Sequence, residues 1–148
     1  MKKILVILTI LLLFIVQGAS AEEKTIQWKN YKEGMALSKK TNKNVYIFFH
    51  TSWCSYCTKM KNTTFKNKEV VEYLNSNFIP IGVDGDKEKD ITKKYRVRAY
   101  PASIFLADGK TSLIMGFVPQ KKFIMIIKYI TTKSYLKMPF TKFIKQNG

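Results

Sequence analysis

Two cysteines that directly follow an apolar run constrain this chain more than any other feature. The run extends from Val45 to Phe49, and every residue in it is β-branched or aromatic, which is typical of a buried strand. Cys54 and Cys57 follow in the segment TSWCSYCTKM, and residues 58–61 contain good helix formers. The sequence therefore predicts that the cysteine pair lies where a strand turns into a helix.

That position has chemical consequences for the two thiols. A thiolate in the first turn of a helix receives unpaired backbone N–H groups and the positive end of the helix dipole. This environment favours the anionic form of Cys54 and predicts a pKa below the free-thiol value of ~8.5. Cys57 lies one turn further on, close enough to resolve a mixed disulfide. A purely structural disulfide between the two residues is the alternative.

Length and composition exclude several other uses of the cysteines. The chain has 148 residues, which suits one domain plus a leader, and its 46% apolar and 14% aromatic residues allow a core without a disulfide framework. Two cysteines and one histidine, His50, cannot supply a closed four-ligand zinc site. Thr58 follows Cys57, so the haem-attachment pattern CxxCH is also excluded.

The N-terminus has the pattern of a signal peptide over residues 1–21. Lys2 and Lys3 precede an apolar run from Ile4 to Val16, and Gly18 to Ala21 provide small residues at a cleavage site. We expect cleavage after Ala21 and a periplasmic or otherwise extracytoplasmic location, where disulfide chemistry is common. An uncleaved anchor is the alternative, although the run is shorter than the ~20 residues that span a bilayer.

A second segment, KYRVRAYPASIF at Lys94 to Phe105, completes a family pattern. Together with WCSYC after a strand and with Asp108-Gly109 further on, it resembles the thioredoxin-like superfamily of thiol-disulfide oxidoreductases. The resemblance covers roughly residues 26–130. The residues after the cysteines, Phe65, Asn67, Glu69 and Val70, are similar to the extracytoplasmic branch that includes the C-terminal domain of DsbD-type interchange proteins.

The resemblance implies an α/β fold, the thioredoxin fold, with a central mixed β-sheet flanked by helices on both faces. The domain would occupy residues 22–133, and residues 134–148 would form a C-terminal extension that packs on it. Cys54 would be the attacking residue, Cys57 the resolving residue and Trp53 a flanking aromatic that shields the site. Tyr100 and Pro101 would form the substrate-binding loop, with Pro101 in the cis form; a trans proline at a strand start is the alternative. The redox-active disulfide would need neither a cofactor nor a metal.

Three positions concern the tuning of this site. Thioredoxins commonly have a buried acid six positions before the first cysteine, and this chain has Phe48 there. The dipeptide between the cysteines is Ser55-Tyr56, without the histidine of strong oxidants, so we expect an intermediate or reducing potential. His50 either tunes the site or makes a structural hydrogen bond at the end of the strand.

Periodicity and capping residues predict the remaining elements. Asn30 and Asp90 are expected to cap helices, Asp108-Gly109 to form a hairpin turn, and Gly116 to be a bulge or a position of close approach. The expected strands are 25–28, 78–83, 97–106 and 111–115, and the expected helices are 31–41, 67–77, 90–95 and 119–131, with a short helix near Phe140, Phe143 and Ile144.

The charge is strongly positive. The net charge is +16 for the whole chain; without residues 1–21, which contain Lys2 and Lys3 and no acid, 24 basic and 10 acidic residues remain, or +14. No acidic residue follows Asp108, so a basic C-terminal region could associate weakly with a membrane surface or an acidic partner. A solvated surface of biased composition is the alternative, and export makes nucleic acid an improbable partner.

These observations predict an exported monomer that reduces or exchanges disulfides in protein substrates and is recharged by a membrane electron donor. A net disulfide oxidase or isomerase is the alternative within enzymes. From another class, the alternative is a non-catalytic binding or chaperone module, for example a copper handler that uses Met60 beside the cysteines.

Overall fold

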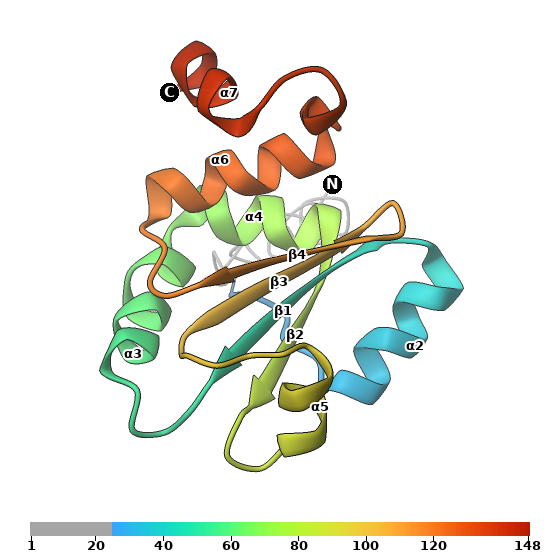
Figure 1. Ribbon diagram of the computed structural model, residues 1–148, viewed down its shortest axis with the longest axis vertical. Helices are drawn as coiled ribbons and strands as arrows, with labels where there is room; N and C mark the ends of the chain where they lie inside the picture. The colour runs from blue at the N-terminus through green and yellow to red at the C-terminus, as the bar shows by residue number, and fades with distance from the viewer. Residues whose placement is uncertain (1–24) are drawn as a thin grey trace, which may run out of the picture.

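The computed structural model describes residues 25–148, and Figure 1 shows the arrangement of its elements. The predicted signal peptide over residues 1–21 lies outside the described residues. Within residues 25–148, no helix has both the length and the apolar character needed to cross a membrane.

A four-stranded mixed sheet forms the centre of the domain. Its strands are β1 (Asn44–His50), β2 (Phe78–Asp84), β3 (Ala102–Ala107) and β4 (Lys110–Met115), in the spatial order β2-β1-β3-β4. β1 and β2 are parallel, whereas β3 is antiparallel to both β1 and β4. The predicted mixed sheet is confirmed, and β4 is the edge strand, as expected.

Helices cover both faces of this sheet (Figure 1). α3, α4 and α6 lie on one face, and α2 and α5 lie on the other. The predicted α/β fold class is therefore confirmed. The elements are α2 (Tyr31–Thr41), α3 (Ser55–Asn62), α4 (Lys68–Asn77), α5 (Lys89–Lys94), α6 (Gln120–Thr131) and α7 (Phe140–Asn147), with single 3₁₀ turns at Thr64–Lys66 and Ser134–Leu136.

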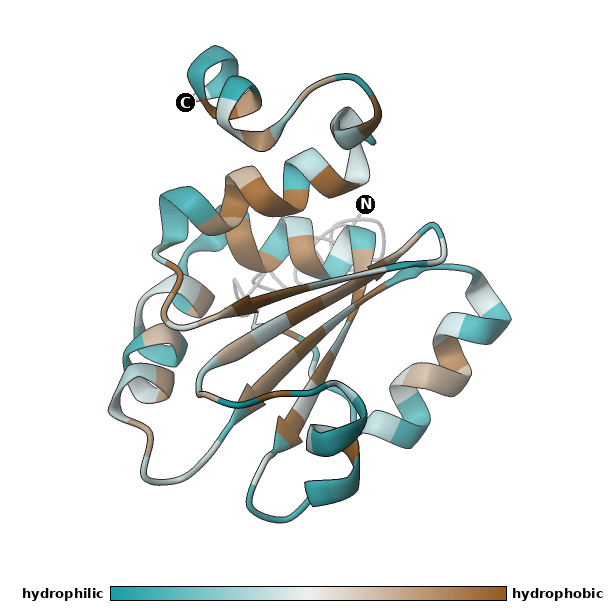
Figure 2. Cartoon of the chain, viewed as in Figure 1, coloured by the Kyte–Doolittle hydropathy of each residue, from teal (hydrophilic) through white to brown (hydrophobic). Residues whose placement is uncertain are grey.

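The strands of the sheet are largely hydrophobic (Figure 2), and the side chains of β1 alternate between two cores of different composition. Tyr46 and Phe48 face α3, α4 and α6, where rings pack edge to face; the Phe48 and Phe65 centroids are 4.9 Å apart at 90°. We call this the aromatic core, and its buried rings are Tyr46, Phe48, Phe65, Phe78, Phe105 and Phe123. The opposite side, the aliphatic core, contains Val45, Ile47, Phe49, Ile79, Ile81, Val83, Ala102 and Ile104.

Of the two predicted helix caps, Asn30 is confirmed and Asp90 is wrong, and Asn67, predicted as the first residue of a helix, is the cap of α4. Asn30 Oδ1 accepts the Glu33 N–H at 2.9 Å, and Asn67 Oδ1 accepts the Val70 N–H at 3.1 Å. Asp90, however, lies inside α5, whose cap residue is Glu88 and has no side-chain capping bond. The Glu88 carboxylate instead accepts the Asp84 N–H at the end of β2.

The predicted first strand, residues 25–28, does not form. A tight turn carries the Trp28 N–H back to the Ile26 carbonyl, and the Asn75 side chain bonds both the Gln27 N–H and the Thr25 carbonyl. These polar groups therefore have partners without a strand ladder. Only a single bridge between Lys29 and Ile81 joins this segment to the sheet.

The prediction of a hairpin turn before the edge strand β4 is confirmed, and the predicted start of β3 is wrong. The hairpin turn has φ of 50° at Asp108 and 71° at Gly109, as the Asp-Gly pair indicates. β3 begins at Ala102 rather than at residue 97, because the preceding segment closes α5 and leads into Pro101. Gly116 has a φ of 94°, but an added Cβ would meet nothing within 4 Å, so its backbone angle and not close approach requires glycine.

The C-terminal extension packs on α6. Phe143 of α7 is buried, and the Tyr129 ring of α6 lies 5.2 Å from both Phe140 and Phe143. At the other end of the extension, Lys133 Nζ lies 2.8 Å from Asp108 Oδ1 in the β3–β4 turn, and Tyr135 Oη donates to the same carboxylate. These contacts hold residues 134–148 against the domain at two points.

Candidate active site

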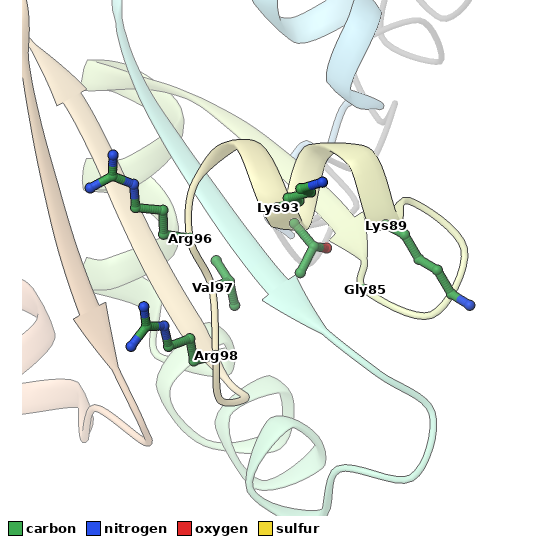
Figure 3. Close-up of a pocket in the computed structure, with 7 residues that line it drawn as sticks. Gly85, Lys89, Lys93, Arg96, Val97 and Arg98 are labelled. Carbon is green, nitrogen blue, oxygen red and sulfur yellow. The ribbon is translucent and has the colours of Figure 1, made fainter.

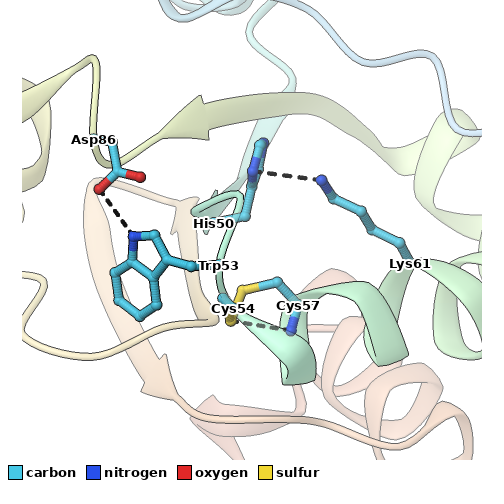
Figure 4. Close-up of a disulfide and its surroundings, with 6 residues drawn as sticks. All are labelled: His50, Trp53, Cys54, Cys57, Lys61 and Asp86. Carbon is cyan, nitrogen blue, oxygen red and sulfur yellow. Dashed lines mark hydrogen bonds between the residues drawn. A yellow bond between two sulfur atoms is a disulfide. The ribbon is translucent and has the colours of Figure 1, made fainter.

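The two cysteines lie at the N-terminus of α3, directly after β1, as predicted. They form a disulfide with an S–S distance of 2.16 Å and a Cα–Cα distance of 5.2 Å (Figure 4). Cys54 is the N-cap residue of α3, with an extended backbone, and Cys57 lies in the first turn of the helix.

The local hydrogen bonds show how the helix start serves the sulfur of Cys54. The Thr58 N–H donates to the Cys54 carbonyl at 3.2 Å, which starts the helix. The Cys57 N–H donates to Cys54 Sγ at 3.1 Å (Figure 4). Sulfur thus occupies the place that a capping oxygen takes in other helices. In the reduced protein the same N–H and the helix dipole favour a thiolate at Cys54.

The two sulfur residues differ in access to solvent. Cys54 is 6% exposed and Cys57 1%, and both belong to the aromatic core, which also contains Met60. The residues before and between the cysteines point outward, because Trp53 is 68% and Tyr56 is 59% exposed. An approaching disulfide therefore reaches Cys54 first, between two exposed rings.

Trp53 forms one side of the site together with Tyr100. Their ring centroids lie 5.9 Å apart in an edge-to-face arrangement, and Trp53 Nε1 donates to Asp86 Oδ1 at 3.3 Å. The Tyr100 ring in turn covers Gly85, where an added Cβ would lie 2.1 Å from Tyr100 Oη. Sequence reasoning placed Trp53 and Tyr100 at the site but missed Gly85 and Asp86, whose only signal was a charged turn containing glycine.

Tyr56 forms the other side together with Phe117. The two rings are 6.4 Å apart, and Lys59 Nζ of α3 lies 4.9 Å from the centre of the Phe117 ring. Phe117 follows β4 and was not predicted as a site residue. The only sequence signal for Phe117 was its position after Gly116.

The Tyr100–Pro101 bond has the cis form that the resemblance implied. The Pro101 carbonyl accepts the Gly116 N–H at 2.7 Å, which joins this loop to the end of β4.

No buried carboxylate lies in the described part of the chain, where the buried polar side chains are Thr51, Thr64 and Ser103. The position expected for an acid holds Phe48, a fully buried ring of the aromatic core. Residues 25–148 also contain no cluster of three or more His, Cys, Asp or Glu side chains that could hold a metal ion.

His50 is the titratable side chain at the end of β1. Its Nδ1 lies 3.4 Å from Lys61 Nζ of α3 (Figure 4), and its ring stacks on Phe48 with 5.5 Å between the ring centroids. Burial, and then the positive charge of Lys61, lowers the pKa of His50 below its usual 6.5. His50 is therefore neutral at neutral pH, and its backbone carbonyl also accepts the Gly85 N–H at 2.8 Å.

Comparison with known proteins places this arrangement in a family. Residues 31–131 match the model of the thioredoxin-like domain. A thioredoxin of Mycoplasmoides gallisepticum is 32% identical over 89 residues, which are 60% of this chain and 85% of that protein.

Two solved structures show the same fold. A thioredoxin from Thermus thermophilus superimposes with a TM-score of 0.67 at 24% identity, over 74% of this chain and 89% of its own. The oxidised C-terminal domain of Neisseria meningitidis DsbD superimposes with a TM-score of 0.55 at 26% identity, over 67% of this chain and 90% of its own. With two cysteines at the start of α3 and a family match over more than half of its length, the chain belongs to the thioredoxin-like domain family and is a thiol-disulfide oxidoreductase.

Proposed function

We infer that this protein is exported and reduces or exchanges disulfides in extracytoplasmic proteins, with Cys54 as the attacking thiol and Cys57 as the resolving thiol. The observation that carries these roles is the asymmetry of the pair. Cys54 Sγ accepts the Cys57 N–H, and Cys54 is the more exposed residue of the two, although both belong to the aromatic core. A thiolate at Cys54 is both stabilised and reachable.

The reaction conserves electrons and protons in two steps. The Cys54 thiolate attacks one sulfur of the substrate disulfide, so a mixed disulfide forms and the other substrate sulfur leaves as a thiolate that takes a proton. Cys57 then loses its proton and attacks Cys54 Sγ. This step forms the Cys54–Cys57 disulfide and releases the second substrate thiol, so the substrate gains two electrons and two protons in all.

Two exposed rings, Trp53 and Tyr56, and two half-buried rings, Tyr100 and Phe117, provide a surface for the substrate chain. Trp53 with Tyr100 on one side and Tyr56 with Phe117 on the other leave a path across Cys54. Trp53, Tyr100 and Pro101 are proposed to contact the substrate, with Ser55 and Tyr56 between the cysteines exposed beside it. Aromatic rings that are already held in place give contact area at little entropic cost.

The location and the partner belong to the same proposal. Lys2 and Lys3, the following apolar run and the small residues before Glu22 support export with cleavage after Ala21. A protein that reduces disulfides in that compartment needs a continuing supply of electrons, so a membrane electron donor is the proposed partner. Met60 does not favour the copper-handling alternative, because its sulfur is fully buried in the aromatic core.

Single substitutions of the cysteines test the roles. Cys54→Ser should abolish reduction of insulin disulfides, whereas Cys57→Ser should accumulate a mixed disulfide that mass spectrometry detects after incubation with an oxidised protein. Ser55→Ala is the matched control: it keeps both thiols, so it should still reduce insulin disulfides and should accumulate no mixed disulfide. Equal trapping by Cys54→Ser and Cys57→Ser would contradict the assigned roles.

N-terminal sequencing of the protein secreted by a bacterial host tests export. The expected mature protein begins at Glu22. A chain that keeps Met1 and stays with the cytoplasmic fraction would refute export while leaving the thiol chemistry untouched.

A further inference from the structure

A basic pocket lies beside the Trp53 side of the active site. It has a volume of about 400 Å³ and is formed by α5 and the segment that follows it (Figure 3). Its lining residues are Gly85, Lys89, Thr92, Lys93, Arg96, Val97 and Arg98. Four of these side chains are cationic and none is acidic.

The positive charge around this pocket is only partly balanced, because residues 84–98 contain six basic and four acidic side chains. Within residues 25–148, Lys89, Lys93, Arg96 and Arg98 form no ion pair. Of the acidic side chains nearby, Asp84 pairs with Lys87, Glu88 accepts the Asp84 N–H and Asp86 accepts Trp53 Nε1. A fourth, Asp90, lies next to Lys89 in the first turn of α5. Arg96 and Arg98 point to the same side of the segment after α5, whereas Lys89 points away from them (Figure 3), so the two guanidinium groups are the charges that a bound anion would contact.

The arginines are concentrated here in a chain whose other basic residues are lysines. Arg96 and Arg98 are the only arginines in the sequence, and both line the pocket. A guanidinium group can bind a carboxylate through two parallel hydrogen bonds, which an ammonium group cannot do. A lysine-rich surface would carry the same charge but could not bind a carboxylate through two parallel hydrogen bonds. The lysine-rich composition of the chain therefore does not explain why both arginines lie here.

Arg96 also occupies a backbone position at which glycine is usual. Its φ is 55°, and α5 ends with the Val97 N–H donating to the Thr92 carbonyl and the Arg96 N–H donating to the Lys93 carbonyl. This pair of bonds is the Schellman motif, in which the left-handed residue is most often glycine. An arginine kept in a strained conformation points to a use for its side chain.

The pocket shares a wall with the active site. Gly85 lines the pocket, and the Tyr100 ring lies directly against its Cα. Tyr100 packs on Trp53, which bonds Asp86 of the same turn. Arg98 is two residues before Tyr100. A peptide that crosses Cys54 and continues past Tyr100 would reach the arginines within a few residues, because an extended chain advances ~3.3 Å per residue.

We propose that this pocket binds acidic side chains of the protein substrate, a few residues from the disulfide that Cys54 attacks. The proposal rests on the proposed function and adds the substrate class, which is disulfides flanked by Asp or Glu. Carboxylates on the substrate would pair with Arg96 and Arg98, while Lys89 and Lys93 would raise the local positive potential and speed association at low salt.

Two synthetic peptides test this proposal on the reduced protein. Both carry one cysteine as a mixed disulfide with 2-thiopyridine, a leaving group without a carboxylate, and a C-terminal amide, and they differ only in having Asp and Glu or Asn and Gln beside the cysteine. Wild type should react faster with the acidic peptide. Arg96→Gly together with Arg98→Gln should lower the acidic-peptide rate about tenfold, as expected for lost charge-assisted bonds, and leave the neutral-peptide rate unchanged.

The substitutions are chosen to keep the fold, since glycine suits the left-handed position of Arg96. Lys121→Gln together with Lys142→Gln removes the same net charge from α6 and α7 and should leave the ratio of the two rates at its wild-type value. A ratio of the two rates that does not change in the arginine variant, or that falls equally in both variants, would overturn the proposal.

Loss of reaction with both peptides in wild type would instead contradict the proposed function. A neutral peptide with a free C-terminal carboxylate separates terminal from side-chain recognition, and a preference for it equal to that for the acidic peptide would overturn the side-chain assignment.

Discussion

The two faces of the sheet are packed in different ways. In the aromatic core, large rings fill a thick layer between the sheet and α3, α4 and α6, and Cys57 lies among them. In the aliphatic core, α2 approaches β2 closely through Gly34, the only buried residue of that helix, and α5 has no buried residue. The redox pair thus lies on the face that is packed with aromatic rings, whereas on the other face α2 approaches the sheet closely at Gly34.

The largest expected effect comes from removing a ring of the aromatic core. Phe123 is fully buried and lies 5.3 Å from Tyr46 and 5.7 Å from Phe65, centroid to centroid. Phe123→Ala should lower the free energy of unfolding by about 3–5 kcal/mol through lost burial and the cavity left behind. Urea unfolding of the oxidised protein measures this. Leu136→Ala, at a residue 67% exposed, should change it by less than about 0.5 kcal/mol; a similar loss there would refute the difference.

A smaller loss is expected from crowding the aliphatic core. A Cβ at Gly34 would lie 2.4 Å from Ile81 Cγ1, so Gly34→Ala should destabilise the protein by about 1–3 kcal/mol despite the better helix propensity of alanine. Gly82→Ala is the matched control, because its Cβ would meet only Trp28, at 4.0 Å. Thermal unfolding of both variants compares them. A tolerated Gly34→Ala would show that α2 can move outward without cost.

The aromatic core also contains one buried polar pair, Tyr46 and Ser103, whose hydroxyl oxygens are 3.0 Å apart. Tyr46→Phe leaves the Ser103 hydroxyl without its partner and should lower the free energy of unfolding by about 1 kcal/mol. Burial raises the pKa of Tyr46 well above its usual value, so the folded protein keeps this proton after the unfolded chain has lost it. Wild type should therefore lose stability above about pH 10, and Tyr46→Phe should lose less. Equal alkaline loss in both proteins would contradict this reasoning.

The smallest effect should appear at His50, where β1 meets the active site. The pKa of His50 is lowered in the folded protein, so between that value and its usual 6.5 the unfolded chain binds more protons. Stability from this residue is complete above about pH 6.5 and falls as the pH is lowered through that range. Urea unfolding at pH 7.5 and 5.5 should show a smaller change in His50→Gln than in wild type. An identical change would mean that other groups cause the acid dependence.

The sequence predicted the fold where a local pattern and the tertiary structure agree. β1 is buried on both sides, so its unbroken apolar run identified a strand, and Asn30 and Asn67 marked helix starts by their own chemistry. The segment at residues 25–28 failed because Asn75, distant in sequence, supplies hydrogen bonds that replace a strand ladder. No local pattern contains that information.

The candidate site shows the same division. Cys54, Cys57 and Trp53 belong to one short motif, and Tyr100 with Pro101 came from the family resemblance. Asp86, Gly85 and Phe117 lie in loops that only the folded sheet brings beside the cysteines. The pairing of His50 with Lys61 likewise requires β1 and α3 to meet at their observed angle.

The bond from the Cys57 N–H to Cys54 Sγ has a consequence for how the protein can be observed. When the disulfide is reduced, its acceptor changes from a neutral sulfur to a thiolate, and the donor remains in the first turn of α3. The nitrogen and hydrogen of this one backbone group therefore sense the charge on the attacking sulfur directly. In the reduced protein, the NMR shift of the Cys57 amide followed against pH would trace the ionisation of Cys54 without any label on the sulfur.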